Sequence, residues 1–195
     1  DKERVACEVA ALARRLHTIP LPDGFLFSSG WESFAAFLLH RLQSCERDQR
    51  AWGTLPEHLL AQLGEYILPL DVLIDFRQSP HLIHADLTGD HLLGSLENGV
   101  WQTHGIIDFG DAMTGSLYYE LPALHLDLFR CDVHLLQVFL QAYGVPDSFQ
   151  DGFQHQAMSY VLLHPFNVLS VIENHLPPLS SLRTLAELAG LIWGN

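Results

Sequence analysis

Apolar side chains recur three and four positions apart over most of this chain, which is the spacing of one face of a helix. The first such stripe ends before Pro20, because proline cannot continue a helix. Ser33 is a candidate cap for the second helix, and Pro56 suits the first turn of the third. The predicted helices cover residues 3–17, 33–42, 56–76, 117–130, 133–143, 149–175 and 182–192.

Three features interrupt this helical pattern. Pro69 is expected to kink or split the helix over 56–76, and Pro165 interrupts the one over 149–175. The charged run at 46–50 (ERDQR) indicates a solvated connection after the second helix.

Strand signals are confined to the middle of the chain. The apolar pair Leu82 and Ile83 follows Pro80. Further on, the runs 92–96 and 100–107 flank Asn98-Gly99, one of the stronger signals for a tight hairpin turn. The predicted fold class is therefore mainly α with a small β-hairpin (α+β).

Length and composition are those of one compact unit. A chain of 195 residues with 48% hydrophobic content can bury one core, and no apolar run reaches the roughly 18 residues that span a bilayer. The first segment is a charged amphipathic helix and not a signal peptide. Because the sequence starts without Met inside a helical pattern, we expect a fragment of a longer chain.

The net charge of −13 argues against a nucleic-acid partner, whose phosphates require clusters of Lys and Arg. An acidic surface would attract a cationic small molecule, but the better supported interpretation is that the acidity serves solubility. Cys7, Cys45 and Cys131 match no metal or redox spacing, which favours reduced thiols and a cytoplasmic setting. We expect no membrane partner.

Two carboxylate-bearing loops each follow a strand-like run. The first acidic loop is 84–91 (HADLTGDH), and the second acidic loop is 106–111 (IIDFGD). The hairpin between them reverses the direction of the chain. Asp86, His91 and Asp108 should therefore lie close together at the open end of the hairpin. Paired carboxylates there suit phosphoryl transfer, which depends on positioning and on neutralising charge.

These loops resemble the His-x-Asp-Leu-x-x-x-Asn catalytic loop and the Asp-Phe-Gly metal loop of kinase-like phosphotransferases. The small residue Ala85 and the further acid Asp111 make the chain most similar to the aminoglycoside phosphotransferase-like family of small-molecule kinases, of the choline kinase type. The resemblance implies that residues 1–195 form a single protein-kinase-like C-terminal lobe. Residues 81–120 would hold the catalytic loop, the hairpin and the metal-binding loop.

The resemblance also implies roles for individual residues. Asp86 would be the catalytic base that accepts the proton of a substrate hydroxyl, with His84 supporting the loop. Asp108 would hold Mg²⁺ against the phosphates of ATP or GTP, and Asp111 would assist a second metal or cap the following segment.

His91 stands where the family has Asn, and imidazole nitrogen suits Zn, Ni, Cu or Fe better than Mg²⁺. Three interpretations stay open: Asp90 supplies the oxygen ligand instead, one metal on Asp108 suffices, or the lobe is an inactive pseudokinase or interaction module. We favour an active-type site with an altered second metal position.

The nucleotide-binding half of the family pattern is missing from these residues. Lys2 is the single lysine, and no Gly-x-Gly-x-x-Gly occurs. The N-terminal nucleotide-binding lobe is therefore missing here: either it was cut off or belongs to residues outside this sequence, or the protein has dispensed with it.

The acceptor would be a small hydroxyl compound, bound between the first acidic loop and residues 117–175. Glu120, Asp127 and Asp132 are candidates to meet a substrate amine. Glu120 has two other interpretations: it braces the first acidic loop, or it lies on a surface helix.

A metal-dependent hydrolase is the main alternative from another enzyme class. Seven residues form a His/Asp-rich set that would hold Zn or two metals: His81, His84, Asp86, Asp90, His91, His104 and Asp108. Their spacing matches no established zinc motif, and the other eight histidines fall in helical patterns, where a lone His is usually at the surface or in the core.

Overall fold

A computed structural model describes residues 1–21, 30–145, 152–172 and 175–194. Its helices are α1 (Lys2–His17), α2 (Glu32–Trp52), α3 (Glu57–Leu60), α4 (Leu63–Tyr66), α5 (Leu70–Leu73), α6 (Leu117–Ala123), α7 (Val133–Tyr143), α8 (Phe153–Leu163) and α9 (Leu185–Trp193). The strands are β1 (His81–Ile83), β2 (Leu92–Glu97), β3 (Val100–Ile106) and β4 (Met113–Gly115). The predicted class, mainly α with a small hairpin, is confirmed.

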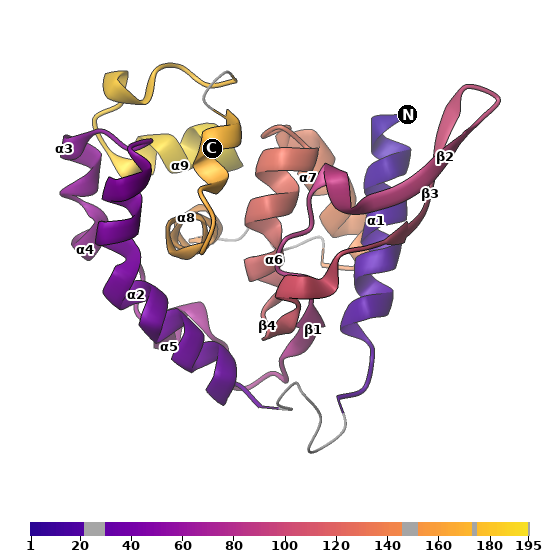
Figure 1. The fold of residues 1–195 in the computed structure, drawn as a ribbon, viewed down its shortest axis with the longest axis horizontal. Helices are drawn as coiled ribbons and strands as arrows, with labels where there is room; N and C mark the ends of the chain where they lie inside the picture. The colour runs from indigo at the N-terminus through magenta and orange to yellow at the C-terminus, as the bar shows by residue number, and fades with distance from the viewer. Residues whose placement is uncertain (22–29, 146–151, 173–174, 195) are drawn as a thin grey trace.

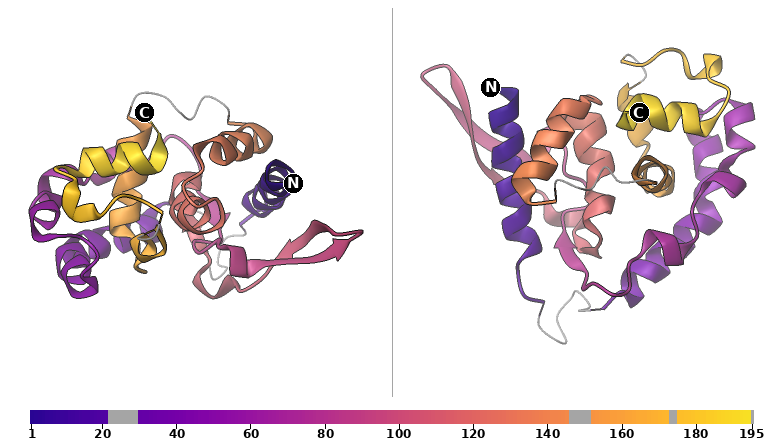
Figure 2. Two further views of the ribbon diagram at one scale, coloured as in Figure 1. Left: turned by 90° about the horizontal axis from the view of Figure 1, so that it is seen from above. Right: turned by 180° about the vertical axis from the view of Figure 1, so that it is seen from behind.

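The helices pack around α6 and α8. Figure 1 shows α1 and the hairpin on one side of the molecule, with α2 to α5 on the other. Helix α1 packs against α7 and β3, α6 packs against α8, and α8 also contacts α2 and α9. In the views of Figure 2, the β2–β3 hairpin projects past the N-terminal end of α1. None of the helices within the described ranges is long and apolar enough to cross a membrane.

Helix α2 is longer than predicted and includes the charged run at 46–50. The run is helical and not a connection, and it is solvated only in part: Glu46, Arg47 and Arg50 are exposed, whereas Asp48 pairs with Arg41 at 2.8 Å and the buried Gln49 donates to the carbonyl of Leu162. The cap is also different: Trp31 occupies the N-cap position, without a side-chain cap bond. Ser33 lies inside the helix.

The single helix predicted over 56–76 is instead three one-turn helices, α3 to α5. Pro56 and Pro69 are the N-cap residues of α3 and α5, both with extended backbones. Proline has no N–H to donate to the preceding turn, so the break at Pro69 was expected. The further break at residues 61–62 was not predicted.

Among the later helices, α7 matches its predicted range, whereas the others agree with the pattern in position but not in length. Helix α7 is capped by the side chain of Asp132 and ends at Gly144 in the left-handed region. The predicted helix over 117–130 changes to a π-helical turn at Leu124–Leu128. Helix α8 ends at Leu163, before the 3₁₀ segment Val168–Ile172, and the predicted start at Phe149 lies outside the described residues.

Two antiparallel strand pairs support the acidic loops. In the hairpin, β2 pairs with β3 from Leu92–Ile106 to Glu97–Val100, with a bulge at Leu93/Gly94. The turn residues Asn98 and Gly99 have φ of 54° and 79°, as a tight hairpin turn requires.

The second pair, β1 with β4, was not predicted beyond the strand at Leu82-Ile83. Strand β4 is only three residues long and carries no alternating pattern. Gly115 in β4 lies so close to its neighbours that a Cβ there would meet Ile83 Cδ1 at 2.7 Å and Phe34 Cε2 at 2.9 Å.

Candidate active site

The first acidic loop begins directly after β1, and its first residue, His84, contacts the second acidic loop. His84 is fully buried, its Nε2 donates to the carbonyl of Ile107 at 2.8 Å, and its Nδ1 accepts from the backbone N–H of Asp86 at 3.3 Å. Its ring therefore joins the end of β3 to the start of the loop. Ala85 has φ of 68°, an uncommon conformation for a residue with a Cβ, which turns Asp86 out of the line of the strand.

Glu120 in α6 holds the beginning of this loop. Its Oε1 accepts from the backbone N–H of His84 at 2.8 Å, and its Oε2 accepts from that of Ala85 at 2.6 Å. The side chain is fully buried, and His17 Nε2 lies 3.4 Å from Oε1. The expectation that Glu120 meets a substrate is wrong, because its carboxylate is enclosed by protein and aimed at the loop backbone.

His164 supports the same turn from the other side. Its Nε2 donates to the carbonyl of Ala85 at 3.1 Å, and its Nδ1 accepts from the N–H of Phe166 at 3.3 Å. Burial lowers the pKa of His164 to about 4, because the charged ring would lose its hydration. The ring is therefore neutral at pH 7, with one nitrogen donating and the other accepting.

His91 lies between the two carboxylates of the site. Its Nδ1 is 3.8 Å from Asp86 Oδ2, and its Nε2 is 3.7 Å from Asp108 Oδ2. Nδ1 also lies 2.6 Å from the carbonyl oxygen of Asp86 and 3.2 Å from Thr88 Oγ1. The structure thus brings together three of the residues singled out from the sequence.

The surroundings of Asp86 favour its protonated form. Burial raises its pKa above the ordinary range, and the negative charges of Asp111 and Asp108 act in the same direction. His91 and His84 oppose this shift. A carboxyl whose pKa is raised in this way is a better proton acceptor than an exposed one.

The second acidic loop is open to solvent. The side chain of Asp108 is 68% exposed, with φ of 61°, and it precedes the 3₁₀ turn Phe109–Asp111. Asp111 is exposed as well. The Phe109 ring lies against the ring of His84, with 4.9 Å between centroids, and this contact is a packing link between the two loops.

A pocket of about 220 Å³ opens beside Asp86 and is the candidate acceptor site. Its lining is more apolar than polar: Asp86, Thr88, Ala123, Leu126, Asp127, Phe166, Asn167, Val168 and Val171. Asp127 lines this pocket, but its Oδ2 already accepts from the N–H of Gly89 at 2.7 Å. Its Oδ1 lies 3.6 Å from Arg130.

Two further acids lie away from the acceptor pocket. Asp132 is exposed and accepts from the N–H groups of His134 and Leu135, so it caps α7, and it does not line this pocket. Asp90 is exposed in the 3₁₀ turn Gly89–His91, and it does not line this pocket.

The His/Asp set of the hydrolase alternative converges only in part, because His104 and His81 do not join Asp86, His91 and Asp108. His104 lies on the hairpin, 2.8 Å from Ser95 Oγ, and His81 stacks on His17 with its Nδ1 directed to the carbonyl of His17. Within the described ranges no group of three His, Cys, Asp or Glu side chains is placed to hold a metal.

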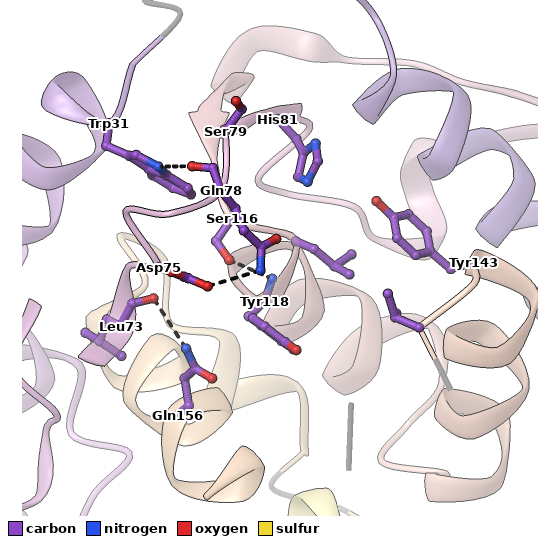
Figure 3. Close-up of a pocket in the computed structure, with 12 residues that line it drawn as sticks. Trp31, Leu73, Asp75, Gln78, Ser79, His81, Ser116, Tyr118, Tyr143 and Gln156 are labelled. Carbon is purple, nitrogen blue, oxygen red and sulfur yellow. Dashed lines mark hydrogen bonds between the residues drawn. The ribbon is translucent and has the colours of Figure 1, made fainter. Parts of the chain in front are cut away.

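A second pocket, of about 200 Å³, lies where β1, α5, α6 and α8 meet (Figure 3). Its polar groups are largely bonded to one another: Trp31 donates to the carbonyl of Gln78, and the Gln78 amide donates to Asp75. Gln156 reaches the carbonyl of Leu73 in the same way. None of the acids from the two acidic loops lines it, so the pocket beside Asp86 is the better candidate for chemistry.

Several residues that shape the site were not singled out from the sequence. His17 and His164 contact the loop supports, and Phe166 and Asn167 line the acceptor pocket. In the sequence, His17 and His164 are marked only by being polar residues within an apolar helical stripe. That signal is shared by ordinary core histidines, so it did not distinguish them.

The shape of the chain is similar to two solved aminoglycoside phosphotransferases. One is the GDP complex of aminoglycoside 2'-phosphotransferase-IIIa, with a TM-score of 0.59, 23% identity, and coverage of 96% of this chain and 60% of that one. The other is ADP-bound APH(2'')-Ib, with a TM-score of 0.56, 18% identity, and coverage of 98% and 65%. The fold is therefore kinase-like, over somewhat less than two thirds of those proteins' lengths.

Sequence comparison adds a relative and a family. A curated relative, the lysine-specific demethylase JMJ21 of Arabidopsis thaliana, is 23% identical over 246 aligned positions, which cover 99% of this chain but only 26% of that protein. The model of the phosphotransferase enzyme family (APH) matches residues 1–155. The chain therefore belongs to the APH phosphotransferase enzyme family.

Proposed function

We propose that this chain is the C-terminal, acceptor-binding lobe of a small-molecule kinase, which transfers the γ-phosphoryl group of ATP or GTP to a hydroxyl. One observation carries the proposal: Asp86 and Asp108, on separate loops, both lie within 4 Å of the same His91 ring. Phosphoryl transfer needs an acid at the acceptor and an acid at the phosphates, close together.

Asp86 is the proposed catalytic base. It lies at the junction between the acceptor pocket and the second acidic loop, so a hydroxyl bound in the pocket can donate to it. The backbone bonds from Glu120 and His84 fix the turn that presents its carboxylate. Its raised pKa suits it to take the proton as the hydroxyl oxygen attacks phosphorus.

Asp108 is the proposed metal ligand. Its carboxylate is exposed, and its one ion pair within the described ranges is with His91, so an oxygen remains available for a divalent ion. The ion would neutralise charge on the nucleotide phosphates. The family pattern implies Mg²⁺, with Asp111 close enough to influence Asp86 and available to assist.

The nucleotide is proposed to be held mainly by a lobe outside these residues. The sequence has one lysine, Lys2, and its glycines form no phosphate-binding loop. The two solved relatives were determined with GDP and with ADP, so the base is left open between guanine and adenine.

The acceptor is proposed to be a small hydroxyl compound with an apolar part. Most of the lining beside Asp86 is apolar, and Asp127 already bonds Gly89 and pairs with Arg130. A substrate amine would therefore meet Asp86 first, with Asp127 as a second, partly neutralised acid. The cysteines are all unpaired, which supports a cytoplasmic setting.

The direct test is Asp86→Asn in the full-length protein, with Asp71→Asn, at an exposed position of α5, as the control. We expect Asp86→Asn to lower kcat by roughly 10² to 10⁴ without changing the melting temperature by more than a few degrees. Asp71→Asn should keep its activity, since Asp71 lies outside both acidic loops and does not line the acceptor pocket. Unchanged turnover in Asp86→Asn would remove Asp86 from the mechanism.

An inactive interaction lobe is the second candidate, and His91 is the observation that favours it. A nitrogen stands where the resemblance implies an oxygen ligand for Mg²⁺. Calorimetric titration of the full-length protein with nucleotide and divalent metal separates the two. An active lobe binds nucleotide in a metal-dependent manner, whereas an interaction lobe gives no heat with either.

A further inference from the structure

The hydrogen bonds of His91 define which of its nitrogens is free. Nδ1 lies 2.6 Å from the carbonyl oxygen of Asp86. A carbonyl oxygen can only accept, so the proton of this bond is on Nδ1. In the neutral ring, the lone pair is therefore on Nε2.

That lone pair faces a carboxylate. Nε2 is 3.7 Å from Asp108 Oδ2, in a partly open setting where His91 is 18% and Asp108 68% exposed. Two electron-pair donors that face each other are stabilised by a cation between them. A separation of 3.7 Å can be spanned by one metal ion, since bonds from nitrogen and oxygen to a divalent metal are about 2.1 Å.

The arrangement around His91 is that of a prepared metal ligand. Ligating histidines commonly donate their second ring N–H to a backbone carbonyl, which fixes the tautomer and the direction of the lone pair. The Asp86 carbonyl does this for His91, with Thr88 Oγ1 also at 3.2 Å from Nδ1. The adjacent acid, Asp90, takes part in none of the hydrogen bonds or ion pairs described for this site.

We propose that His91 Nε2 is a metal ligand that works with Asp108, and that it shifts the preference of the site from Mg²⁺ towards a first-row transition ion such as Mn²⁺ or Zn²⁺. Imidazole nitrogen binds these ions better than it binds Mg²⁺, which strongly prefers oxygen. The inference rests on the proposed function, because the ion would sit at the nucleotide phosphates. It concerns the identity of the ion and not the transfer itself.

The test measures ion preference without turnover. Mn²⁺ binding to the full-length protein is followed by electron paramagnetic resonance with a non-hydrolysable ATP analogue present, and Mg²⁺ is then added as competitor. For His91→Asn we expect the ratio of Mn²⁺ to Mg²⁺ affinity to fall by about 10-fold or more, the usual size of a ligand-level effect. His104→Asn, which removes a histidine from the hairpin, should leave the ratio unchanged.

A second readout locates the nitrogen. In a long-range proton–nitrogen spectrum of the ring, Zn²⁺ alone should shift the Nε2 resonance of His91 while its Nδ1 stays protonated. Asp108→Asn should weaken binding of both ions. Melting curves show whether His91→Asn is folded, and His91→Gln serves in its place if it is not.

Two results would overturn the inference. One is an unchanged ratio in His91→Asn when Asp108→Asn has lost both ions, since the metal would then be held without His91. The other is Zn²⁺ binding that leaves the His91 ring resonances unmoved. Neither result touches the role of Asp86, which is judged by turnover of Asp86→Asn.

Discussion

The two acidic loops meet at one ring but are supported in opposite ways. The first acidic loop is enclosed: His84 is fully buried, Ala85 is 3% exposed, and Glu120 and His164 bond its backbone. In the second acidic loop the Asp108 side chain is 68% exposed, and its described partner is His91 alone.

The difference follows the demands of the chemistry proposed for each loop. A base must already be aimed at the substrate hydroxyl, because a small misplacement is costly in rate. A metal ligand can complete its geometry when the ion and the nucleotide arrive. We therefore expect mutations near the first acidic loop to change stability, and mutations in the second to change binding alone.

The largest effect is expected for Glu120→Ala. It removes the acceptor of two buried N–H groups, each worth roughly 1–3 kcal/mol when left unpaired, so the free energy of unfolding should fall by about 3 kcal/mol. Urea denaturation measures it. Asp132→Ala is the matched control, because that exposed carboxylate also accepts two N–H groups, and its loss should cost about 1 kcal/mol. Equal losses of stability in the two variants would contradict the conclusion that the buried Glu120 carboxylate stabilises the first acidic loop.

A smaller effect is expected for Gly115→Ala, beneath the strand that leads into the first acidic loop. The new Cβ would stand 2.7 Å from Ile83 Cδ1, and overpacking of this kind costs about 1–3 kcal/mol. Gly64→Ala in α4 is the control, since a Cβ there has nothing within 4 Å and alanine favours a helix. A Gly115→Ala protein as stable as the wild type would mean that β1 and β4 are loosely packed.

The next effect in size is the pH dependence of stability, which tests the buried support of the first acidic loop by His164. Because the pKa of His164 is about 4 in the folded state and near 6.5 when unfolded, stability is full above pH 6.5 and is lost as the pH falls towards 4. His125 contributes in the same sense, whereas the raised pKa of Asp86 acts oppositely. His164→Gln should make the slope shallower by up to about 1.4 kcal/mol per pH unit. Denaturation at several pH values measures it, and an identical slope would contradict a neutral, buried His164.

The smallest effect on stability is expected for Asp108→Asn. The side chain is mostly exposed and asparagine tolerates the positive φ, so the free energy of unfolding should change by no more than about 0.5 kcal/mol. Metal binding should nevertheless be lost. Calorimetry measures the metal binding, and urea denaturation of the same sample measures the stability. A loss of stability similar to that of Glu120→Ala would contradict the proposed difference in support between the two loops.

Local signals were sufficient for the features that depend on neighbouring residues. Asn98-Gly99 predicted the hairpin turn, and the helix over 133–143 lies between Asp132 and Gly144 as the pattern indicated. The convergence of Asp86, His91 and Asp108 followed from the hairpin, since it needs no information beyond the strand pairing.

Long-range contacts were not predictable in the same way. Strand β4 is a strand only through its backbone pairing with β1. The residues Met113–Gly115 themselves carry no strand pattern. The charged run at 46–50 resembles a solvated connection until Gln49 is seen to bond the chain 113 residues later. The role of Glu120 was one of three open interpretations, and only the positions of the His84 and Ala85 N–H groups decide among them.

The two ends of the hairpin differ in how well they should tolerate inserted or deleted residues. Leu92 faces Ile106 where the strands meet the loops, so losing one residue there would turn alternate side chains to the wrong side and pull the acids out of alignment. At the tip, Glu97, Asn98 and Gly99 are exposed, and a Cβ on Gly99 would touch nothing. A dye, an epitope or a longer turn could be grafted at the tip while the spacing of Asp86, His91 and Asp108 stays as it is.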